Sequence, residues 1–251
     1  LPLFFDPDRL AEGKRELRFF PELPSRFGIV PRADLHAEVK WFETPPAFIL
    51  HSANYFEMGD EIIMDSCLSF DPKGPGVGEN ADHNARIMAH LDKHKTKTRL
   101  HRIRLNTVTG ETSQTLISDE IVEFPVCANR CKGHPYRFAY ASLFEPGAWL
   151  MNGIIKLDVE TGATTRYRYG EQRYGGEVHF AARTHSSSED DGYLIVFVQD
   201  LIKDQSECLI LDAQAIERGP IAAVVLPERI QTGTHACWIE GERLNAERPC
   251  P

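Results

Sequence analysis

The sequence predicts an all-β fold, and a β-propeller in particular. From Thr98 onward, short runs rich in Val, Ile, Tyr and Phe alternate with turn residues, which is the pattern of consecutive short strands. Three runs lead into a tight turn that ends in glycine, at Gly110, Gly162 and Gly219, so the turns fall 52 and 57 residues apart. A β-only unit that repeats at about 50 residues has the size of a propeller blade. A β-sandwich also has regular strands but no whole-unit period of this length, so we prefer the propeller.

The segment before this repeat is less regular. Residues 1–27 are rich in proline and arginine, and we expect a short helix at 8–18. Hydrophobic runs bounded by turn residues then predict strands. These strands cover residues 28–31, 41–43, 47–50 and 61–67, the second and third forming a pair around Thr44-Pro45-Pro46. A loop at 71–78 and a helix at 80–93 complete the expected elements.

The repeated turns have a recognisable chemistry. Asn106 to Gly110 and Asp158 to Gly162 both read Asn/Asp-x-x-Thr-Gly, and the turn that ends at Gly219 is a looser version. In such a turn the glycine supplies the positive φ that other residues adopt at a cost. We therefore expect each turn to join two antiparallel strands of one blade.

Composition limits the class of protein. The chain has 251 residues, 42% of them hydrophobic, and a net charge of −9 without any basic patch, which argues against a nucleic-acid partner. No run of 18 apolar residues and no signal peptide is visible, and Leu1 begins in mid-strand character. We expect residues 1–251 to be the C-terminal part of a single propeller domain in a longer protein.

Cysteine usage indicates a reducing compartment. The six cysteines are scattered, and a chain of this size does not need disulfides, so we expect free thiols. Cys127, Cys131 and His134 have a spacing that resembles half of a zinc site, but no second ligand pair of that kind follows. We therefore do not assign zinc to them.

Two histidines and two glutamates occur at related places. Glu123, Glu177 and His235 lie 13, 15 and 16 residues after the three turn glycines, and His51 ends the hydrophobic run 47–50. In a propeller, residues at equal phase lie at equal distance from the central axis, so the four side chains are expected to converge. Two imidazoles and two carboxylates suit a metal site. A core histidine at position 51, a strand-end Glu123 and a turn Glu177 are the alternatives.

Six motifs in order resemble the carotenoid cleavage oxygenase family, which includes carotenoid and apocarotenoid cleavage dioxygenases and lignostilbene dioxygenases. The motifs are Arg26-Phe-Gly-Ile-Val-Pro-Arg32, His51-Ser-Ala-Asn-Tyr-Phe-Glu57, Glu123-Phe-Pro125, Arg173-Tyr-Gly-Gly-Glu177, the segment 190–200 and Pro227-Glu-Arg-Ile-Gln-Thr-Gly-Thr-His235. The resemblance covers nearly the whole chain.

The resemblance implies a seven-bladed propeller with Fe(II) held on its axis by four histidines. His51 and His235 correspond to the third and fourth iron ligands, and Glu123 and Glu177 correspond to two of three carboxylates that bond the ligand rings. The first two histidines would lie upstream of this chain. By resemblance the reaction is cleavage of a conjugated C=C bond of a carotenoid or apocarotenoid with O2, giving two carbonyl products.

Three positions expected to line the substrate tunnel bear on substrate choice, and two of them differ from the family pattern. Leu50 and Thr234 stand where family members often have phenylalanine, and Phe124 is a third expected lining residue. Cleavage of a stilbene is the first alternative, a metal-free propeller that serves as a binding module is the second, and an isomerase-like activity is the third. An apolar substrate also suggests peripheral membrane contact, in the cytoplasm or a plastid.

The other histidines have no place in these motifs. We expect His179 and His185 to lie in a loop after Glu177. The remaining ones near the charged segment, His83, His90, His94 and His101, are expected to be solvated.

Overall fold

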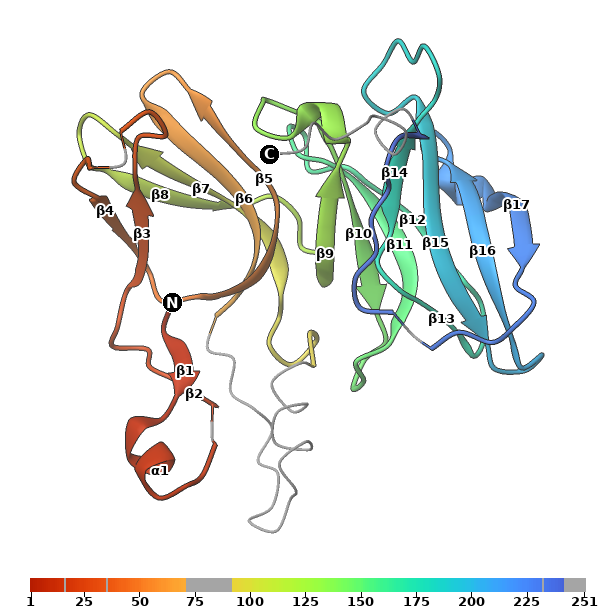
Figure 1. Ribbon diagram of the computed structural model, residues 1–251, viewed down its shortest axis with the longest axis horizontal. Helices are drawn as coiled ribbons and strands as arrows, with labels where there is room; N and C mark the ends of the chain where they lie inside the picture. Colours follow the sequence, from red (N-terminus) through yellow and green to blue (C-terminus); the bar gives the residue numbers. More distant parts are fainter. Residues whose placement is uncertain (16, 35, 71–91, 232, 242–251) are drawn as a thin grey trace, which may run out of the picture.

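The computed structural model describes residues 1–15, 17–34, 36–70, 92–231 and 233–241, and in these residues the chain is built almost wholly from antiparallel β-strands (Figure 1). The expected all-β class is confirmed. Each blade-sized unit runs from an inner strand to an outer one in chain order.

The first unit is a four-stranded sheet with the order β5 (Phe48–Met58), β6 (Glu61–Ser69), β7 (Arg99–Asn106) and β8 (Thr112–Leu116). The expected strand at 47–50 therefore continues through His51 and the seven residues that follow it. Side chains of β5, β6 and β7 pack with those of the next unit in one core cluster that contains Ile63, Leu100 and Leu143.

The second and third units form one nine-stranded sheet. The second unit contains β9 (Val122–Cys127), β10 (Phe138–Phe144), β11 (Met151–Asp158) and β12 (Thr164–Arg168), with a 3-10 turn at Asn129–Cys131. The third contains β13 (Arg173–Gly175), β14 (His179–Ala182), β15 (Gly192–Asp200), β16 (Gln205–Asp212) and β17 (Pro220–Val225), with a 3-10 turn at Ile216–Arg218. The sheet passes from the second unit to the third where β11 pairs with β13, at the residue pair Met151 and Gly175.

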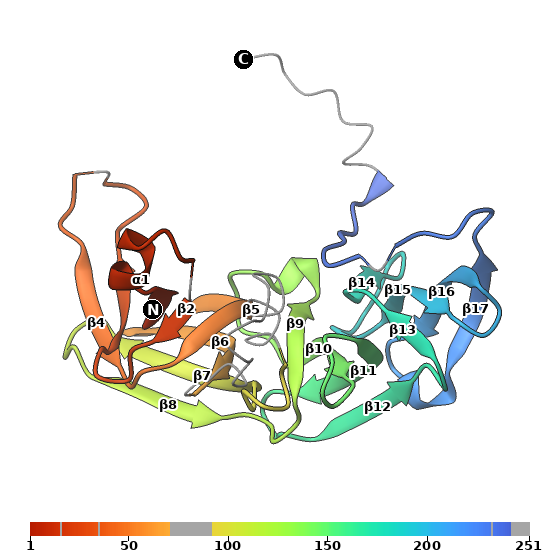
Figure 2. The same ribbon diagram turned by 90° about the horizontal axis from the view of Figure 1, so that it is seen from below.

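Figure 2 shows the units side by side in an open arc with β9 in its middle. Strands β5 and β9 are in contact, as are β9 and β14, so the inner strands of neighbouring units meet. This is the arrangement that would bring residues of equal phase together.

The repeated turns have the predicted conformation. Gly110, Gly162 and Gly219 have φ of 81°, 75° and 80°, in the left-handed region that glycine adopts at little cost. Asn106 Oδ1 accepts hydrogen bonds from the backbone N–H of Val108 and Thr109, at 2.9 and 2.8 Å. Asp158 closes the second turn in the same way. Each turn joins two paired strands, as expected.

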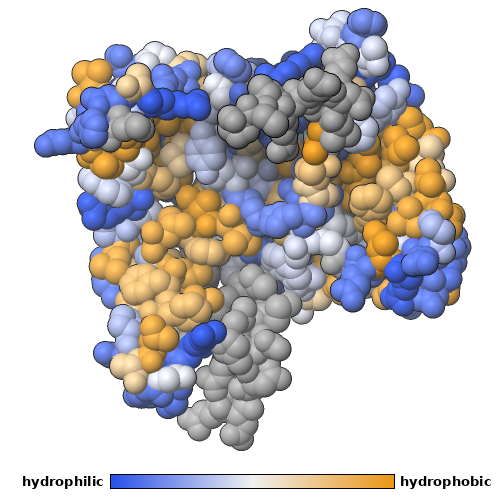
Figure 3. Space-filling view, in the orientation of Figure 1, coloured by the Kyte–Doolittle hydropathy of each residue, from blue (hydrophilic) through white to orange (hydrophobic). Residues whose placement is uncertain are grey.

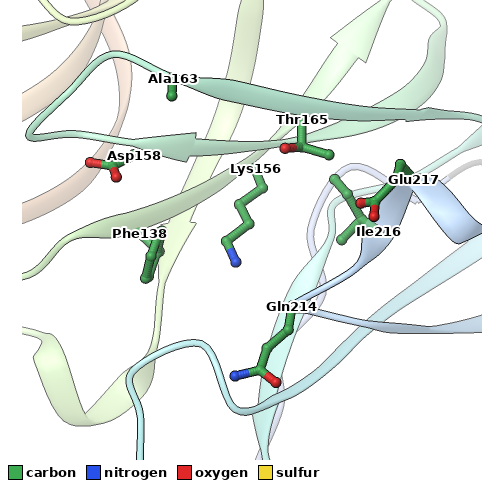
Figure 4. A pocket seen from close by; sticks show the side chains of 8 residues that line it. All are labelled: Phe138, Lys156, Asp158, Ala163, Thr165, Gln214, Ile216 and Glu217. Atoms are coloured by element: carbon green, nitrogen blue, oxygen red, sulfur yellow. The ribbon is translucent and has the colours of Figure 1, made fainter.

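A half-buried lysine also connects the second and third units. Lys156 on β11 donates to Asp190 Oδ2 at 2.7 Å and to the carbonyl oxygen of Ala213 at 3.0 Å. Its Nζ lies 4.2 Å from the ring centroid of Phe138. Figure 4 shows Lys156 pointing into the pocket between the units, with Phe138 and Gln214 beside it. The polar partners satisfy the ammonium group, so this pocket is a structural contact between blades.

The N-terminal part differs from the expectation in two places. The helix α1 covers only Pro7–Ala11, because the residues after it form β2 (Leu17–Phe19), which pairs with β1 (Leu3–Phe5). The expected strands at 41–43 and 47–50 exist but do not pair with each other. Instead β4 (Lys40–Thr44) pairs with β3 (Ser25–Ile29), and β5 pairs with β6. The two prolines between β4 and β5 pass the chain from one sheet to the next.

The expected loop at 71–78 lies outside the described residues, as does most of the expected helix at 80–93.

Candidate metal centre

The four candidate residues come from three units and lie together. His51 is on β5, Glu123 is on β9, Glu177 lies between β13 and β14, and His235 follows β17. Nδ1 of His51 donates to Oε2 of Glu123 at 2.7 Å, and Nδ1 of His235 donates to Oε2 of Glu177 at 3.2 Å. The centroids of the two imidazole rings are 5.2 Å apart. Residues up to 184 positions apart in the sequence therefore form one cluster.

Glu123 is completely buried, and its carboxylate is bonded to the backbone N–H of the next residue. The same Oε2 that accepts from His51 also accepts the backbone N–H of Phe124 at 2.7 Å. Phe124 has a φ of 53°, which a residue with a Cβ adopts at a cost of about 1–2 kcal/mol. The strained backbone turns this N–H toward the carboxylate and turns the Phe124 ring toward the histidines.

Glu177 has a second set of donors. Its Oε2 also accepts the backbone N–H of Ala236 at 3.0 Å, and His179 Nε2 lies 3.5 Å away. Burial raises the pKa of Glu177, but the nearby His179 imidazole and the hydrogen bonds from Ala236 and His235 outweigh it, and the net pKa lies below the ordinary value. Glu177 is therefore a carboxylate at neutral pH and accepts the Nδ1 proton of His235.

These contacts fix the chemistry of the two imidazoles. When Nδ1 donates to a carboxylate, the neutral ring has its lone pair at Nε2, which is the atom that binds a metal. Neutral imidazoles are suitable ligands for ferrous iron. Both rings fit this role, whereas no group of three or more metal-binding side chains is found within the described residues. The described part of the chain thus brings together two imidazoles that each contact a carboxylate through Nδ1, and their role as metal ligands stays a prediction.

An aromatic cluster borders the imidazoles. Phe124 stacks on His51 with ring centroids 4.4 Å apart and lies edge-on to His235 at 5.5 Å. Phe124 packs in turn with three side chains that the sequence analysis missed, Phe144, Trp149 and Met151. No periodic signal marks them, because they belong to β10, β11 and the turn between those strands, and only the folded units bring them to the histidines.

The other two expected lining positions stay predictions. Leu50 precedes His51 on β5 and is 38% exposed, and Thr234 precedes His235 in an exposed stretch. Neither belongs to the aromatic cluster.

Three histidines are placed differently from the sequence-based expectation. His179 lies on β14 rather than in a loop, because residues 179–182 pair with β15. His101 is buried on β7, where Nδ1 contacts the carbonyl oxygen of Arg99 at 2.9 Å. His94 is half-buried, with Nε2 at 2.9 Å from the carbonyl oxygen of Phe144. His185 lies in an exposed turn, as expected, while His83 and His90 lie outside the described residues.

Comparison with known proteins defines the class. Residues 1–240 match the family model described as retinal pigment epithelial membrane protein, RPE65, and the chain belongs to this family. The fold agrees: cobalt-substituted Synechocystis ACO superposes with a TM-score of 0.78 at 28% identity, over 89% of this chain and 46% of that one.

Individual relatives are oxygenases. The chain is 33% identical to carotenoid 9,10(9',10')-cleavage dioxygenase of Crocus sativus, over 97% of this chain and 46% of the relative. It is 30% identical to apocarotenoid-15,15'-oxygenase of Synechocystis, over 89% and 44%. Lignostilbene-alpha,beta-dioxygenase isozyme III of Sphingomonas paucimobilis is 29% identical, over 94% and 51%. The chain spans about half the length of these relatives. In the part of the chain that the structure describes, no helix is long and apolar enough to cross a membrane.

Proposed function

We propose that this chain supplies one half of the iron site of a non-haem Fe(II) dioxygenase, and that the reaction is cleavage of a conjugated C=C bond of a carotenoid or apocarotenoid with O2 to two carbonyl products. The observation that carries the proposal is the pair of carboxylate-held imidazoles with ring centroids 5.2 Å apart. Relatives named for this reaction support the substrate class.

The residues of this chain would position the metal. Glu123 and Glu177 hold the Nδ1–H groups of His51 and His235, so that each Nε2 is unprotonated and its direction is fixed. Iron, when bound by these and two further histidines, would supply the activation of dioxygen. No side chain of this chain is assigned as a general acid or base.

The aromatic cluster would hold and shield the substrate. Phe124, Phe144 and Met151 are each at most 2% exposed, and Trp149 packs against them at the partly exposed side. Apolar and aromatic surfaces of this kind suit a long conjugated hydrocarbon and keep water from the reacting bond. Leu50 and Thr234 are proposed as further lining residues, smaller than phenylalanine.

Domain, compartment and membrane contact follow from the same proposal. Residues 1–251 would form part of a single propeller domain. A relative from Arabidopsis thaliana, the dioxygenase NCED6, is named chloroplastic, which supports a plastid as one of the two expected compartments beside the cytoplasm. Peripheral membrane contact would give access to a substrate dissolved in lipid.

The test uses the full-length gene product loaded with Fe(II). It is incubated with a carotenoid, an apocarotenal and a hydroxylated stilbene in separate reactions under 18O2. The products are separated by chromatography, and their masses are measured by mass spectrometry. The proposal expects labelled aldehydes or ketones from one of the first two substrates. Cleavage of the stilbene alone would favour the stilbene alternative, and the absence of labelled cleavage products from iron-loaded protein would contradict both.

A further inference from the structure

Lys93 is a buried cation to which the proposed function assigns no role. Its side chain is among the largest fully buried ones, with 1% of the residue exposed. Lysine is almost never buried to this extent unless an opposite charge compensates it. The nearest carboxylate along the chain, Asp92, faces Lys95, with the ammonium and carboxylate 3.7 Å apart. Among the described residues, Asp92 is therefore not the partner of Lys93.

Ring contacts connect Lys93 to the candidate metal centre. Its Nζ lies 5.0 Å from the ring centroid of Trp149. Trp149 contacts Phe124, whose ring stacks on His51 and whose backbone N–H is bound by Glu123. The ammonium group therefore lies against the aromatic cluster whose Phe124 is bonded to Glu123.

Glu123 is the buried anion that needs compensation. It is 0% exposed, and while Oε2 accepts two hydrogen bonds, Oε1 has no hydrogen-bond partner among the described residues. Burial of an ionised carboxylate costs several kcal/mol unless a charge or further donors offset it. Burial lowers the pKa of Lys93, and the charge of Glu123 acts in the opposite direction. The two groups thus interact through space rather than as a direct ion pair in the described part of the chain.

Among the described residues, the buried Cys67 thiol also interacts with both groups, and burial raises its pKa well above the ordinary value, so it is neutral. Lys93 and Glu123 therefore form one buried pair of opposite charges separated by the aromatic cluster.

We propose that Lys93 is the buried counter-charge of Glu123, and that through Glu123 it is a positioning residue for the His51 ring. The inference does not depend on the proposed reaction, because the pair exists without metal or substrate. It gives a role to a residue that has no contact with either imidazole.

The first test is a double-mutant cycle on the metal-free full-length protein, with Lys93→Met, Glu123→Gln and the double variant. Lys93→Met is expected to lower the thermal midpoint by about 5–10 °C in the wild-type background, because it leaves Glu123 buried without a counter-charge. In the Glu123→Gln background the drop is expected to be much smaller. If Lys93→Met does not fold, the double variant decides: a folded double variant supports the pair, and an unfolded one overturns it.

Two controls separate charge from packing. Lys93→Arg keeps the charge and is expected to lose less than Lys93→Met, whereas Lys95→Met removes an exposed lysine two positions away and is expected to change little in either background. Equal losses from Lys93→Met in both backgrounds would show that only the packed side chain matters, and would overturn the proposal.

The positioning step is tested by cobalt(II) binding to the same proteins, followed by absorption spectroscopy. Lys93→Met is expected to change the dissociation constant several-fold in the wild-type background and to leave it unchanged in the Glu123→Gln background. A change of the same size in both backgrounds would contradict action through Glu123.

Discussion

At the residue scale, the two candidate ligands differ in how firmly the fold holds them. The His51 side chain is 24% exposed and its partner Glu123 is fully buried. The His235 side chain is 64% exposed, and its contact to Glu177 is longer, at 3.2 Å. The half of the site on β5 and β9 is therefore built into the blades, whereas the other half depends on the segment after β17.

Replacement of Glu123 by glutamine tests the better-held half. The amide keeps the shape of the side chain but loses the charge that favours the Nδ1–H tautomer of His51. We expect the affinity for Fe(II) or Co(II) to fall by about 10–100-fold, measured by titration of the full-length protein. The exposed Glu111→Gln is the control and should bind as the wild type does. Unchanged affinity in Glu123→Gln would contradict the assigned role.

His101 is expected to make the protein sensitive to acid. Burial lowers its pKa below 6.5, since the interior disfavours the charged ring. The unfolded chain therefore binds the proton more readily, so the stabilisation from the neutral ring is complete above about pH 6.5 and is lost as pH falls through the lower folded-state pKa. In urea denaturation from pH 7 to pH 5, His101→Gln should lose less stability than the wild type. The exposed His36→Gln should behave as the wild type, and an equal loss in His101→Gln would refute the prediction.

The residues that sequence could identify are those with a repeating phase. Corresponding places in the units are occupied by His51, Glu123, Glu177 and His235. Because the inner strands of neighbouring units meet, these four side chains lie close together in the structure. The positive φ of Phe124 and the burial of Lys93 have no such signal. They result from contacts between units, which the sequence of either unit does not contain.

At the element scale, Asn54 connects β5, the strand that carries His51, to the segment that follows β9. Its Nδ2 donates to the carbonyl oxygens of Cys131 and His134 at 2.9 Å each, and its Oδ1 accepts from the N–H of Gly133 at 2.9 Å. The bonded segment follows β9, the strand of Glu123. Asn54 thus fixes β5 relative to β9 three residues beyond His51.

Removal of these bonds should destabilise the protein. Asn54→Ala removes three hydrogen bonds made by a buried side chain, which should cost about 2–4 kcal/mol of unfolding free energy in chemical denaturation. Asn129→Ala, at an exposed position near the same segment, is the control and should cost little. A loss for Asn54→Ala no larger than the control would show that β5 is held by other contacts.

The elements that sequence predicted best are the hairpins with local turn chemistry. Asn106 and Asp158 cap their turns through hydrogen bonds within three residues, so the local sequence determines them. The strands at 41–43 and 47–50 were wrongly paired because their partners depend on which sheet each one joins. The prolines between them resemble a hairpin turn but mark the passage between sheets.

At the scale of the whole molecule, the described units form an arc with exposed apolar side chains at one end. Ile221, Val224 and Val225 on β17 are each more than half exposed, and Figure 3 shows hydrophobic surface over this end. Such an edge favours association between copies. The 251 residues also hold two candidate imidazole ligands, where the family resemblance implies four.

These features predict that the 251-residue chain by itself is inactive. Two imidazoles should bind iron weakly, so we expect substoichiometric iron and no product from carotenoid or apocarotenal. Iron is counted by mass spectrometry of purified protein, and products are followed by chromatography, with the full-length gene product as the positive control. Stoichiometric iron together with turnover in the chain alone would contradict the prediction.

The proposed binding of metal by His51 and His235 is tested by the iron content of the full-length protein and three variants. We expect about one iron per chain in the wild type and in the control His134→Ala, whose side chain is exposed, and a large loss of iron in His51→Ala and His235→Ala. Circular dichroism confirms that each variant is folded. Full iron content in folded His51→Ala and His235→Ala would contradict the account.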